Sequence, residues 1–366
     1  MTSTTTHTGT DGRVTVRISD PGELIAAVPH LLSFRPGPSV VLLNHAGAKE
    51  RRILPVIRAD LPDESFEPDA VRELVRRLLR HPGAGVTVVI IGCRPGHRAP
   101  PGEVPHKQLA GLLVRALDDV GRPVDHALWV PEIRAGVPWR CYLDDCPPGV
   151  LPDDRDTVMA AAMATRGWVT YDSREEMSRL LDPDDPAAIE RRQRMLDAAV
   201  DRLAEAPAPE AIAAAMGHFG AEESAAHLSV VRAALARAEA GDLDLSDEDV
   251  VSLAMALSNL EVRDRCLRTA EPPGEPASNA AERLWLELVR RTPPPERAEP
   301  AVLLGYSAYR RGDCVLAGLA FDNALTARPG HRLAELLDLC LDRQIPPAAL
   351  SRLSHPNGGA PMANTP

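Results

Sequence analysis

Hydrophobic and polar residues follow two different periods along the chain, and the period changes near residue 150. Short apolar or alternating runs predict β-strands at residues 14–18, 40–43, 52–58, 86–91, 125–130 and 139–143. Between them, apolar residues at helical spacing predict helices near residues 20–32, 68–79 and 107–120. This alternation predicts an α/β domain over residues 13–150, a mixed sheet with covering helices.

Local signals refine this prediction. Asp20 precedes Pro21, and a carboxylate follows at Glu23, a pattern that predicts a helix N-cap at Asp20. Pro55 lies inside a predicted strand, which indicates an edge strand or a bulge. The run at 86–91 is almost wholly β-branched and predicts a central strand buried on both faces.

Beyond residue 150 the pattern is helical and predicts no strand. Helices are expected near residues 157–165, 186–204, 222–240, 250–267, 280–290, 301–310, 313–327 and 332–341, with Pro-rich connectors at 206–209, 271–276 and 292–300. An all-helical domain over residues 151–345 follows. The Thr-rich residues 1–12 and the residues 346–366, rich in Pro and Gly, are expected to be disordered tails.

The end of the helical part resembles one 34-residue helix-turn-helix repeat of the tetratricopeptide type. With Pro329 aligned to the proline that ends the repeat, the characteristic positions are Leu304, Gly305, Ala317, Phe321 and Ala324. Small residues would let the two helices approach, and Phe321 would fill the space between layers. We expect Arg310 and Arg328 to be exposed on the same helices. This segment has two interpretations: it is part of a peptide-binding repeat array, or it is an antiparallel helix pair inside an irregular bundle.

Composition narrows the class of protein. Hydrophobic residues make up 44%, charged residues 25% and aromatic residues 3%, which is typical of a globular chain with an aliphatic core. The net charge of −11 resides almost entirely beyond residue 150, so nucleic-acid binding is not expected. The sequence shows neither a secretory signal nor a long apolar run, and its six cysteines indicate reduced thiols. We therefore expect a cytoplasmic protein without a membrane span.

The chain carries no phosphate-binding glycine loop, HExxH or GxSxG motif, so whether it is an enzyme stays open. Cys93, His97, His106, Cys141 and Cys146 could supply zinc ligands, but their spacing lacks the paired knuckles of structural zinc sites. We predict no metal and no cofactor. A nucleophilic Cys146 lacks an adjacent base in the sequence.

Polar residues at the ends of predicted strands are the candidates for ligand binding, because α/β proteins bind ligands there. They are Arg58, Asp60, Trp139, Arg140, Tyr142 and Cys146. The alternative for the first two is a local ion pair or turn, and for Asp20 it is the helix cap described above.

Six blocks of sequence together resemble an actinobacterial family known only as a domain of unknown function, DUF4192. These blocks are residues 20–34, 39–43, 58–62, 139–149, 262–264 and 303–337. The resemblance implies an intracellular protein with the same two-part layout and transfers no reaction. Related sequences carry more cysteine within the 139–149 block, where this chain has Leu143 and Asp144, and this difference argues against a zinc or redox role.

Two functional hypotheses follow. The first is a non-catalytic adaptor or regulatory protein whose helical half binds a protein partner. The second is a small-molecule hydrolase or transferase with a pocket at the strand ends that carry Arg58, Asp60 and the 139–146 segment. We favour the adaptor. The sequence does not determine the oligomeric state.

Overall fold

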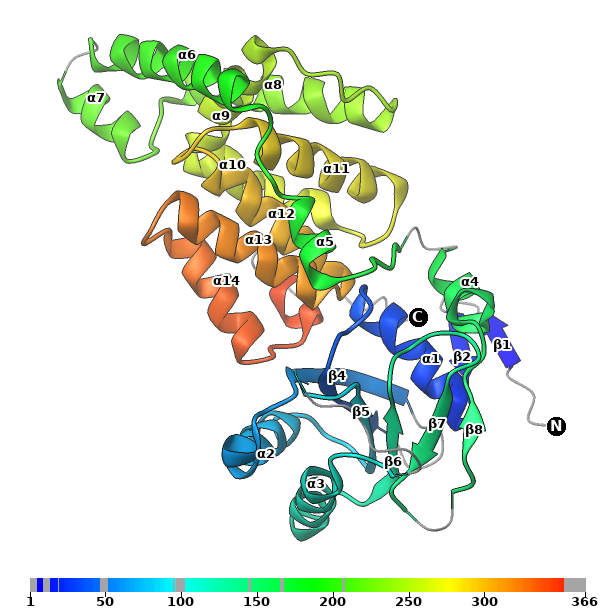
Figure 1. The fold of residues 1–366 in the computed structure, drawn as a ribbon. Helices are drawn as coiled ribbons and strands as arrows, with labels where there is room; N and C mark the ends of the chain where they lie inside the picture. Colours follow the sequence, from blue (N-terminus) through cyan, green and yellow to red (C-terminus); the bar gives the residue numbers. More distant parts are fainter. Residues whose placement is uncertain are drawn as a thin grey trace, which may run out of the picture. The chain divides into compact units, whose positions relative to one another are not determined.

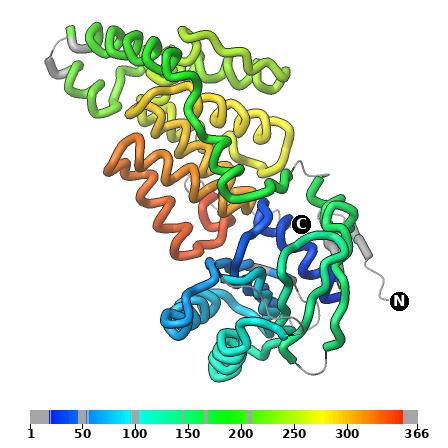
Figure 2. Tube along the Cα trace, viewed as in Figure 1, coloured from blue at the N-terminus to red at the C-terminus, as the bar shows by residue number. Residues whose placement is uncertain are grey.

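The structure, a computed structural model, describes residues 5–8, 14–18, 20–46, 52–94, 96, 103–143, 146–164, 168–205 and 208–351. The chain forms two compact units, Met1–Glu176 and Met177–Pro366. Figure 2 traces the first unit from blue to green and the second from green to red.

A six-stranded mixed sheet organises the first unit, in the order β4-β3-β5-β6-β7-β8 (Figure 1). The strands are β3 (Ser39–Ala46), β4 (Arg52–Asp60), β5 (Gly85–Ile91), β6 (Val124–Val130), β7 (Pro138–Cys141) and β8 (Gly149–Val150). Only β5 and β6 are parallel within this sheet, and helix α3 (Lys107–Asp119) makes the crossover that a parallel pair requires. The predicted α/β class is confirmed.

The strands of the sheet are buried where their apolar residues predict burial. Strand β5 is buried along its whole length, as its β-branched run predicts. Strand β4 lies at the edge of the sheet, and its register with β3 shifts between Leu43 and His45, near Pro55. Helices α2 (Glu67–Leu78) and α3 pack on one face of the sheet through apolar residues, while α1 (Pro21–Leu32) lies on the opposite face (Figure 1).

The predicted N-terminal tail contains a strand. β1 (Thr5–Thr8) pairs antiparallel with β2 (Val14–Arg17) in a separate two-stranded sheet. The β-branched threonines, which we expected to form a disordered tail, favour an extended backbone once β2 offers a partner. Residues 1–4 and 9–12 lie outside the described part.

The segment after residue 150 belongs to the first unit, whereas we placed the domain boundary there. It forms a 3₁₀ turn, η2 (Asp154–Asp156), and helix α4 (Val158–Ala164). Backbone hydrogen bonds then join Tyr171 to the end of α1: its N–H donates to the Ser33 carbonyl (2.9 Å), and its carbonyl accepts from the Arg35 N–H (2.9 Å). The boundary between compact units therefore follows Glu176.

The second unit is helical throughout its described residues. After α5 (Arg174–Arg179), which begins in the first unit, it contains α6 (Pro186–Ala204), α7 (Ala208–Ala215), α8 (Ala221–Glu239), α9 (Asp247–Ser258), α10 (Leu260–Cys266), α11 (Pro276–Arg291), α12 (Ala298–Arg311), α13 (Cys314–Ala327) and α14 (Arg332–Asp342). Two short 3₁₀ turns also belong to this unit: η3 (Leu267–Ala270) comes directly after α10, and η4 (Pro347–Leu350) comes after α14.

Three predictions about this unit were wrong in detail. The single helix expected at 250–267 is broken by Asn259, whose side chain caps α10 by accepting from the N–H groups of Glu261 and Val262. Helix α7 begins inside the connector expected at 206–209. Within the predicted C-terminal tail, Leu350 is buried and its carbonyl accepts a hydrogen bond from the Tyr306 hydroxyl. Residues 352–366 lie outside the described part.

The repeat-like pattern corresponds to real packing. Helices α12 and α13 form an antiparallel pair joined by Gly312, which has a φ of 95°, and Asp313, which caps α13. A side chain at Gly305 would begin 2.4 Å from the Phe321 ring. The residues at the repeat positions are buried: Leu304, Gly305, Ala317, Phe321 and Ala324. Pro329 lies in the exposed turn before α14.

Candidate functional site

The strand-end candidates Arg58 and Asp60 pair with each other. An Arg58 Nη2 lies 2.5 Å from Asp60 Oδ1, and its Nε donates to the Ser39 hydroxyl at 2.9 Å. The guanidinium also lies over the Phe34 ring, 5.9 Å from its centroid. Arg58 is therefore held by three neighbours of its own unit, whereas the Asp60 side chain is 83% exposed.

Trp139 packs against the beginning of helix α1. A Cβ atom added to Gly22 would lie 2.9 Å from the indole nitrogen, and one added to Gly149 would lie 2.8 Å from the ring. Asp20 completes this junction as predicted, because its carboxylate accepts from the N–H groups of Gly22 (2.8 Å) and Glu23 (3.1 Å). The two glycines hold the indole between them.

Cys146 lies beside Cys141 at the same junction. Burial raises the pKa of the Cys146 thiol to about 11, and hydrogen bonding to Cys141 and the nearby charge of Asp20 act in the same direction. A thiol with this pKa stays protonated at neutral pH and is a poor nucleophile or metal ligand. Among the described residues, no three His, Cys, Asp or Glu side chains are grouped so as to hold a metal ion. His97 lies outside them.

Tyr142 faces the other side of the sheet. Its side chain packs against the core under α2 and α3, and its hydroxyl donates to the Pro105 carbonyl at 2.8 Å. Burial raises the pKa of the Tyr142 phenol, so the hydroxyl remains a hydrogen-bond donor. Arg140 is exposed. The structure thus brings Trp139 and Cys146 together near α1 and places Tyr142 on the opposite face.

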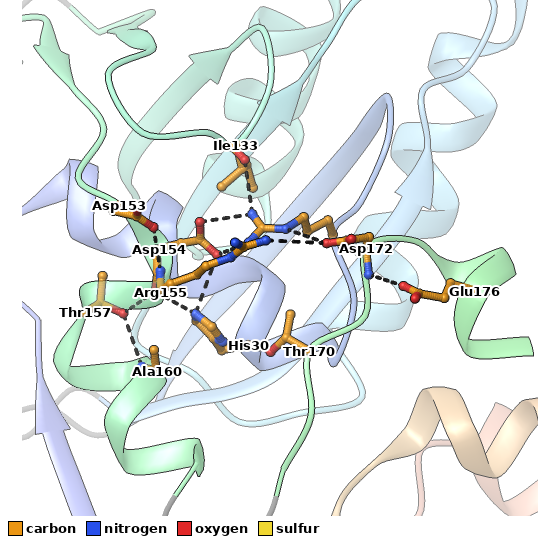
Figure 3. Close-up of polar contacts among 11 residues, drawn as sticks. His30, Ile133, Asp153, Asp154, Arg155, Thr157, Ala160, Thr170, Asp172 and Glu176 are labelled. Carbon is orange, nitrogen blue, oxygen red and sulfur yellow. Dashed lines mark hydrogen bonds and ion pairs between the residues drawn. The ribbon is translucent and has the colours of Figure 1, made fainter. Parts of the chain in front are cut away.

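A buried polar cluster that sequence reasoning missed joins α1 to the segment after β8 (Figure 3). Arg35 donates two hydrogen bonds to the Asp154 carboxylate, at 3.0 and 2.7 Å. The His30 ring contacts the Thr170 hydroxyl at 2.8 Å and the Asp154 carbonyl at 2.9 Å. Asp172 contributes a second, exposed carboxylate, 3.4 Å from the Arg35 Nε. Within the cluster, His30 and Thr170 are 140 positions apart in sequence.

The contacts of His30 select one tautomer of its neutral ring. Its Nε2 lies nearest a carbonyl oxygen, which only accepts, so in the neutral ring Nε2 carries the proton and Nδ1 accepts from the Thr170 hydroxyl. A hydroxyl donating to an imidazole is an arrangement of nucleophile and base. The Asp154 carboxylate is engaged by Arg35 rather than by the ring, from which it lies 3.8 Å away. The cluster therefore serves as a link between the α1 region and the segment after β8.

The second unit holds a groove of about 390 Å³ between α8 and the α10–η3 segment. Leu228, Val231 and Leu235 supply its apolar wall, and their spacing places them on one stripe of α8. Three arginines surround this wall: Arg232, Arg265 and Arg268. All three are exposed, and Arg265 pairs with Glu261 on its own helix. The groove thus combines apolar contact with positive charge.

A second buried charge cluster lies at the junction of α10, α12 and the α13–α14 turn. The Glu299 carboxylate, 1% exposed, lies 3.3 Å from Arg263 Nη1, 2.7 Å from Arg328 Nη1 and 3.2 Å from His331 Nε2. Burial alone would raise the pKa of Glu299, but the hydrogen bond from His331 and the charges of its partners outweigh burial and lower it. Glu299 itself lies in the connector predicted at 292–300, where helix α12 already begins at Ala298.

Two arginines expected to be freely exposed are engaged in this unit. Arg328 forms part of the Glu299 cluster. The Arg310 side chain is 8% exposed and pairs with Glu271 at 2.5 Å. Both arginines, which helical spacing places on the outer face, thus pair with carboxylates from elsewhere in the unit.

Residues 21–348 match the sequence model of a family described as a domain of unknown function, DUF4192. The chain belongs to the DUF4192 family. The match begins at the first residue of α1 and ends within η4, so the family includes the sheet, the cluster around Asp154 and the groove of the helical unit. No curated protein and no solved structure is significantly similar to the chain.

The structure gives the DUF4192 blocks noted in the sequence a structural role. The 20–34 and 139–149 blocks meet where Trp139 packs on Gly22, and the 262–264 and 303–337 blocks meet around Glu299. Within the described part of the chain, no helix has the length and apolar character needed to cross a membrane.

Proposed function

We propose that this DUF4192 protein is a non-catalytic cytoplasmic adaptor whose helical unit binds an acidic amphipathic helix of a protein partner. The groove between α8 and α10–η3 carries the proposal. Leucines of such a helix would pack on Leu228, Val231 and Leu235. Carboxylates beside them would meet Arg232, Arg265 and Arg268, in the way that helix-in-groove recognition combines apolar anchors with complementary charge.

The chemistry of the other candidates supports a binding role over catalysis. Arg58 is held by Ser39, Asp60 and Phe34, and the Cys146 thiol stays protonated at neutral pH. A hydrolase or transferase at the strand ends would need such groups free and activated. The free cysteines agree with a reducing compartment, and the net charge of −11 disfavours nucleic acid as a partner.

A designed peptide tests the proposal. A fluorescent helical peptide with leucines at i, i+3 and i+7, flanked by glutamates, is titrated with the full chain at low and high salt. We expect saturable binding that weakens with salt. The double variant Arg232→Glu and Arg265→Glu should lose at least about tenfold in affinity, since two charge contacts become repulsive.

Arg194→Glu is the matched control, because Arg194 is exposed on α6 and pairs with Glu190 of its own helix. This variant should bind like the unmodified chain. Equal affinity for the groove variant and the control, or no saturable binding, would contradict the proposed function.

A further inference from the structure

One buried side chain, that of Asn259, joins the two walls of the α8 groove. Its Oδ1 accepts from the N–H groups of Glu261 and Val262, at 3.0 and 3.4 Å, and so caps α10. Its Nδ2 donates to the Ser224 hydroxyl of α8 at 2.9 Å and lies 3.5 Å from Nδ1 of His227. Asn259 is 1% exposed, so these contacts are shielded from water. A single amide therefore links α10 to α8.

This link lies at one end of the groove. His227 directly precedes Leu228, which belongs to the apolar wall on α8. Helix α10 begins at Leu260, directly after Asn259, and carries Arg265 on the opposite wall. A change in the contacts of Asn259 would therefore move one wall of the groove relative to the other.

The contacts of Asn259 suit a neutral His227 ring. Two backbone N–H groups of α10 hold the amide oxygen, so the atom that faces His227 is the amide nitrogen, which only donates. In the neutral ring, Nδ1 is then the acceptor and Nε2 carries the proton. Protonation would place a second N–H at Nδ1, directed at another donor. The link between the walls is thus compatible with the neutral ring alone.

The surroundings of the ring favour this neutral form. The loop before α8 contributes Phe219, which meets the ring edge to face with centroids 4.9 Å apart. Burial lowers the pKa of His227 below its ordinary value of 6.5 and outweighs the opposite effect of Glu223, one turn earlier on α8. Among the charges of the described residues, that of Glu223 is the one that acts on the ring. Asn259 and Phe219 face it without charge.

We propose that Asn259 positions the two walls of the groove and that protonation of His227 breaks this link, so that the groove releases its partner helix as the pH falls. This inference rests on the proposed function, since it names the regulation of the same groove. The pKa of His227 is lowered in the linked state. The stabilisation of that state is therefore complete above about pH 6.5 and is lost as the pH falls through the lower pKa.

The designed acidic peptide tests the inference when it is titrated with the full chain between pH 7.5 and 5.5 at constant salt. Its glutamates and the arginines of the groove keep their charges over this range, because their ordinary pKa values are about 4.3 and above about 12. We expect the affinity to fall by about threefold or more. One histidine with an ordinary pKa of about 6.5 can contribute at most about tenfold over this range.

Two histidine variants identify the group responsible. His227→Gln does not titrate, and its side-chain oxygen can accept from the Asn259 amide, so its affinities at pH 7.5 and 5.5 should be equal. His218→Gln is the matched control, because His218 is exposed in the loop before α8. This control should keep the full pH dependence. A pH dependence that persists in His227→Gln, or that disappears in His218→Gln, overturns the inference.

Asn259→Asp separates positioning of the groove from a purely structural role. The carboxylate still caps α10, but it only accepts, so the link to α8 now favours a protonated His227. Peptide affinity in this variant should therefore rise as the pH falls, opposite to the unmodified chain. A purely structural residue would weaken binding at every pH without reversing the slope, and that result would contradict the inference. If the variant does not fold, His227→Gln decides alone.

The pH series also separates the two proposals. If the peptide binds with the same affinity at pH 7.5 and 5.5, the regulation is wrong and the proposed function stands. If the peptide does not bind at pH 7.5, both are wrong.

Discussion

At the scale of single residues, small side chains determine which surfaces can meet. Gly305 admits the Phe321 ring between α12 and α13, and Gly22 and Gly149 admit the indole of Trp139. In each case an aromatic ring fills the space that a Cβ atom would occupy. Positions that stood out in the sequence as motifs are therefore packing contacts in the structure.

Truncating Phe321 tests this interpretation in the helical unit. The side chain is fully buried, so Phe321→Ala should lower the free energy of unfolding by about 3–5 kcal/mol. Gly305→Leu should be comparably destabilising, because the new side chain would collide with the ring. Urea unfolding followed by circular dichroism measures both. Thr326→Ala, an exposed change on α13, should stay within about 0.5 kcal/mol. Unchanged stability for Phe321→Ala would refute the packing.

Removing Asp154 tests the buried cluster of the first unit. Its side chain is 4% exposed and accepts two hydrogen bonds from Arg35. Asp154→Ala leaves a largely buried guanidinium without this partner, and loss of one member of a buried pair costs about 3–5 kcal/mol. Asp172→Ala removes a carboxylate that is 74% exposed and should cost less than about 1 kcal/mol. Denaturant unfolding of the two variants should therefore differ clearly, and equal effects would count against the link.

At the scale of elements, the sequence predicted the helices and strands whose apolar residues recur at a regular spacing. Strands β3 to β7, helices α1 to α3 and the α12–α13 pair have regular apolar periods, and all were predicted close to their bounds. The break at Asn259 escaped prediction because the apolar period continues through it, while its cap and its buried bond to Ser224 depend on tertiary contact.

The candidate site was less predictable than the elements. The arginines of the groove come from α8, α10 and η3, and its outline depends on how α8 packs beside η3, which no local pattern encodes. The His30–Thr170 and Arg35–Asp154 contacts likewise join residues more than a hundred positions apart. The local sequence signal for this cluster was a histidine, His30, in an otherwise apolar stretch of helix α1.

The pH dependence of the helical unit tests the cluster that links α10, α12 and α14. The pKa of Glu299 is lower in the folded unit than its ordinary value of 4.5. Its stabilising contribution is therefore present above pH 4.5 and is lost as the pH falls through the lower, folded pKa. Glu299→Gln should reduce stability at neutral pH, on the order of 3 kcal/mol, because two arginines lose their charged partner.

This variant should also flatten the acid limb of the stability curve, since the amide does not titrate. Urea unfolding between neutral and acidic pH gives both quantities. Glu335→Gln, an exposed change on α14, is the control and should leave the curve unchanged. An acid limb as steep in Glu299→Gln as in the unmodified chain would show that other carboxylates cause it.

At the scale of the whole molecule, the end of the first unit lies beyond the last strand of its sheet. The chain leaves β8 at Val150, yet its next segment returns to α1 through Asp154, Thr170 and Tyr171. Cutting the chain where the strand pattern stops would therefore remove one side of a buried ion pair, together with the backbone hydrogen bonds that join Tyr171 to the end of α1.

Two fragments test this boundary. The fragment of residues 1–176 should fold with a sharp unfolding transition, because it retains the Arg35–Asp154 pair and the bridge between Phe34 and Tyr171. The fragment of residues 1–149 leaves Arg35 and His30 without their buried partners, and each unsatisfied buried group costs about 1–3 kcal/mol or more. We expect it to be less stable by several kcal/mol, in line with the Asp154→Ala variant of the longer fragment. Chemical unfolding of all three, monitored by tryptophan fluorescence, gives the comparison. If the shorter fragment proves as stable as the longer one, the segment after residue 150 only rests on the sheet, and the boundary read from the sequence is the better one.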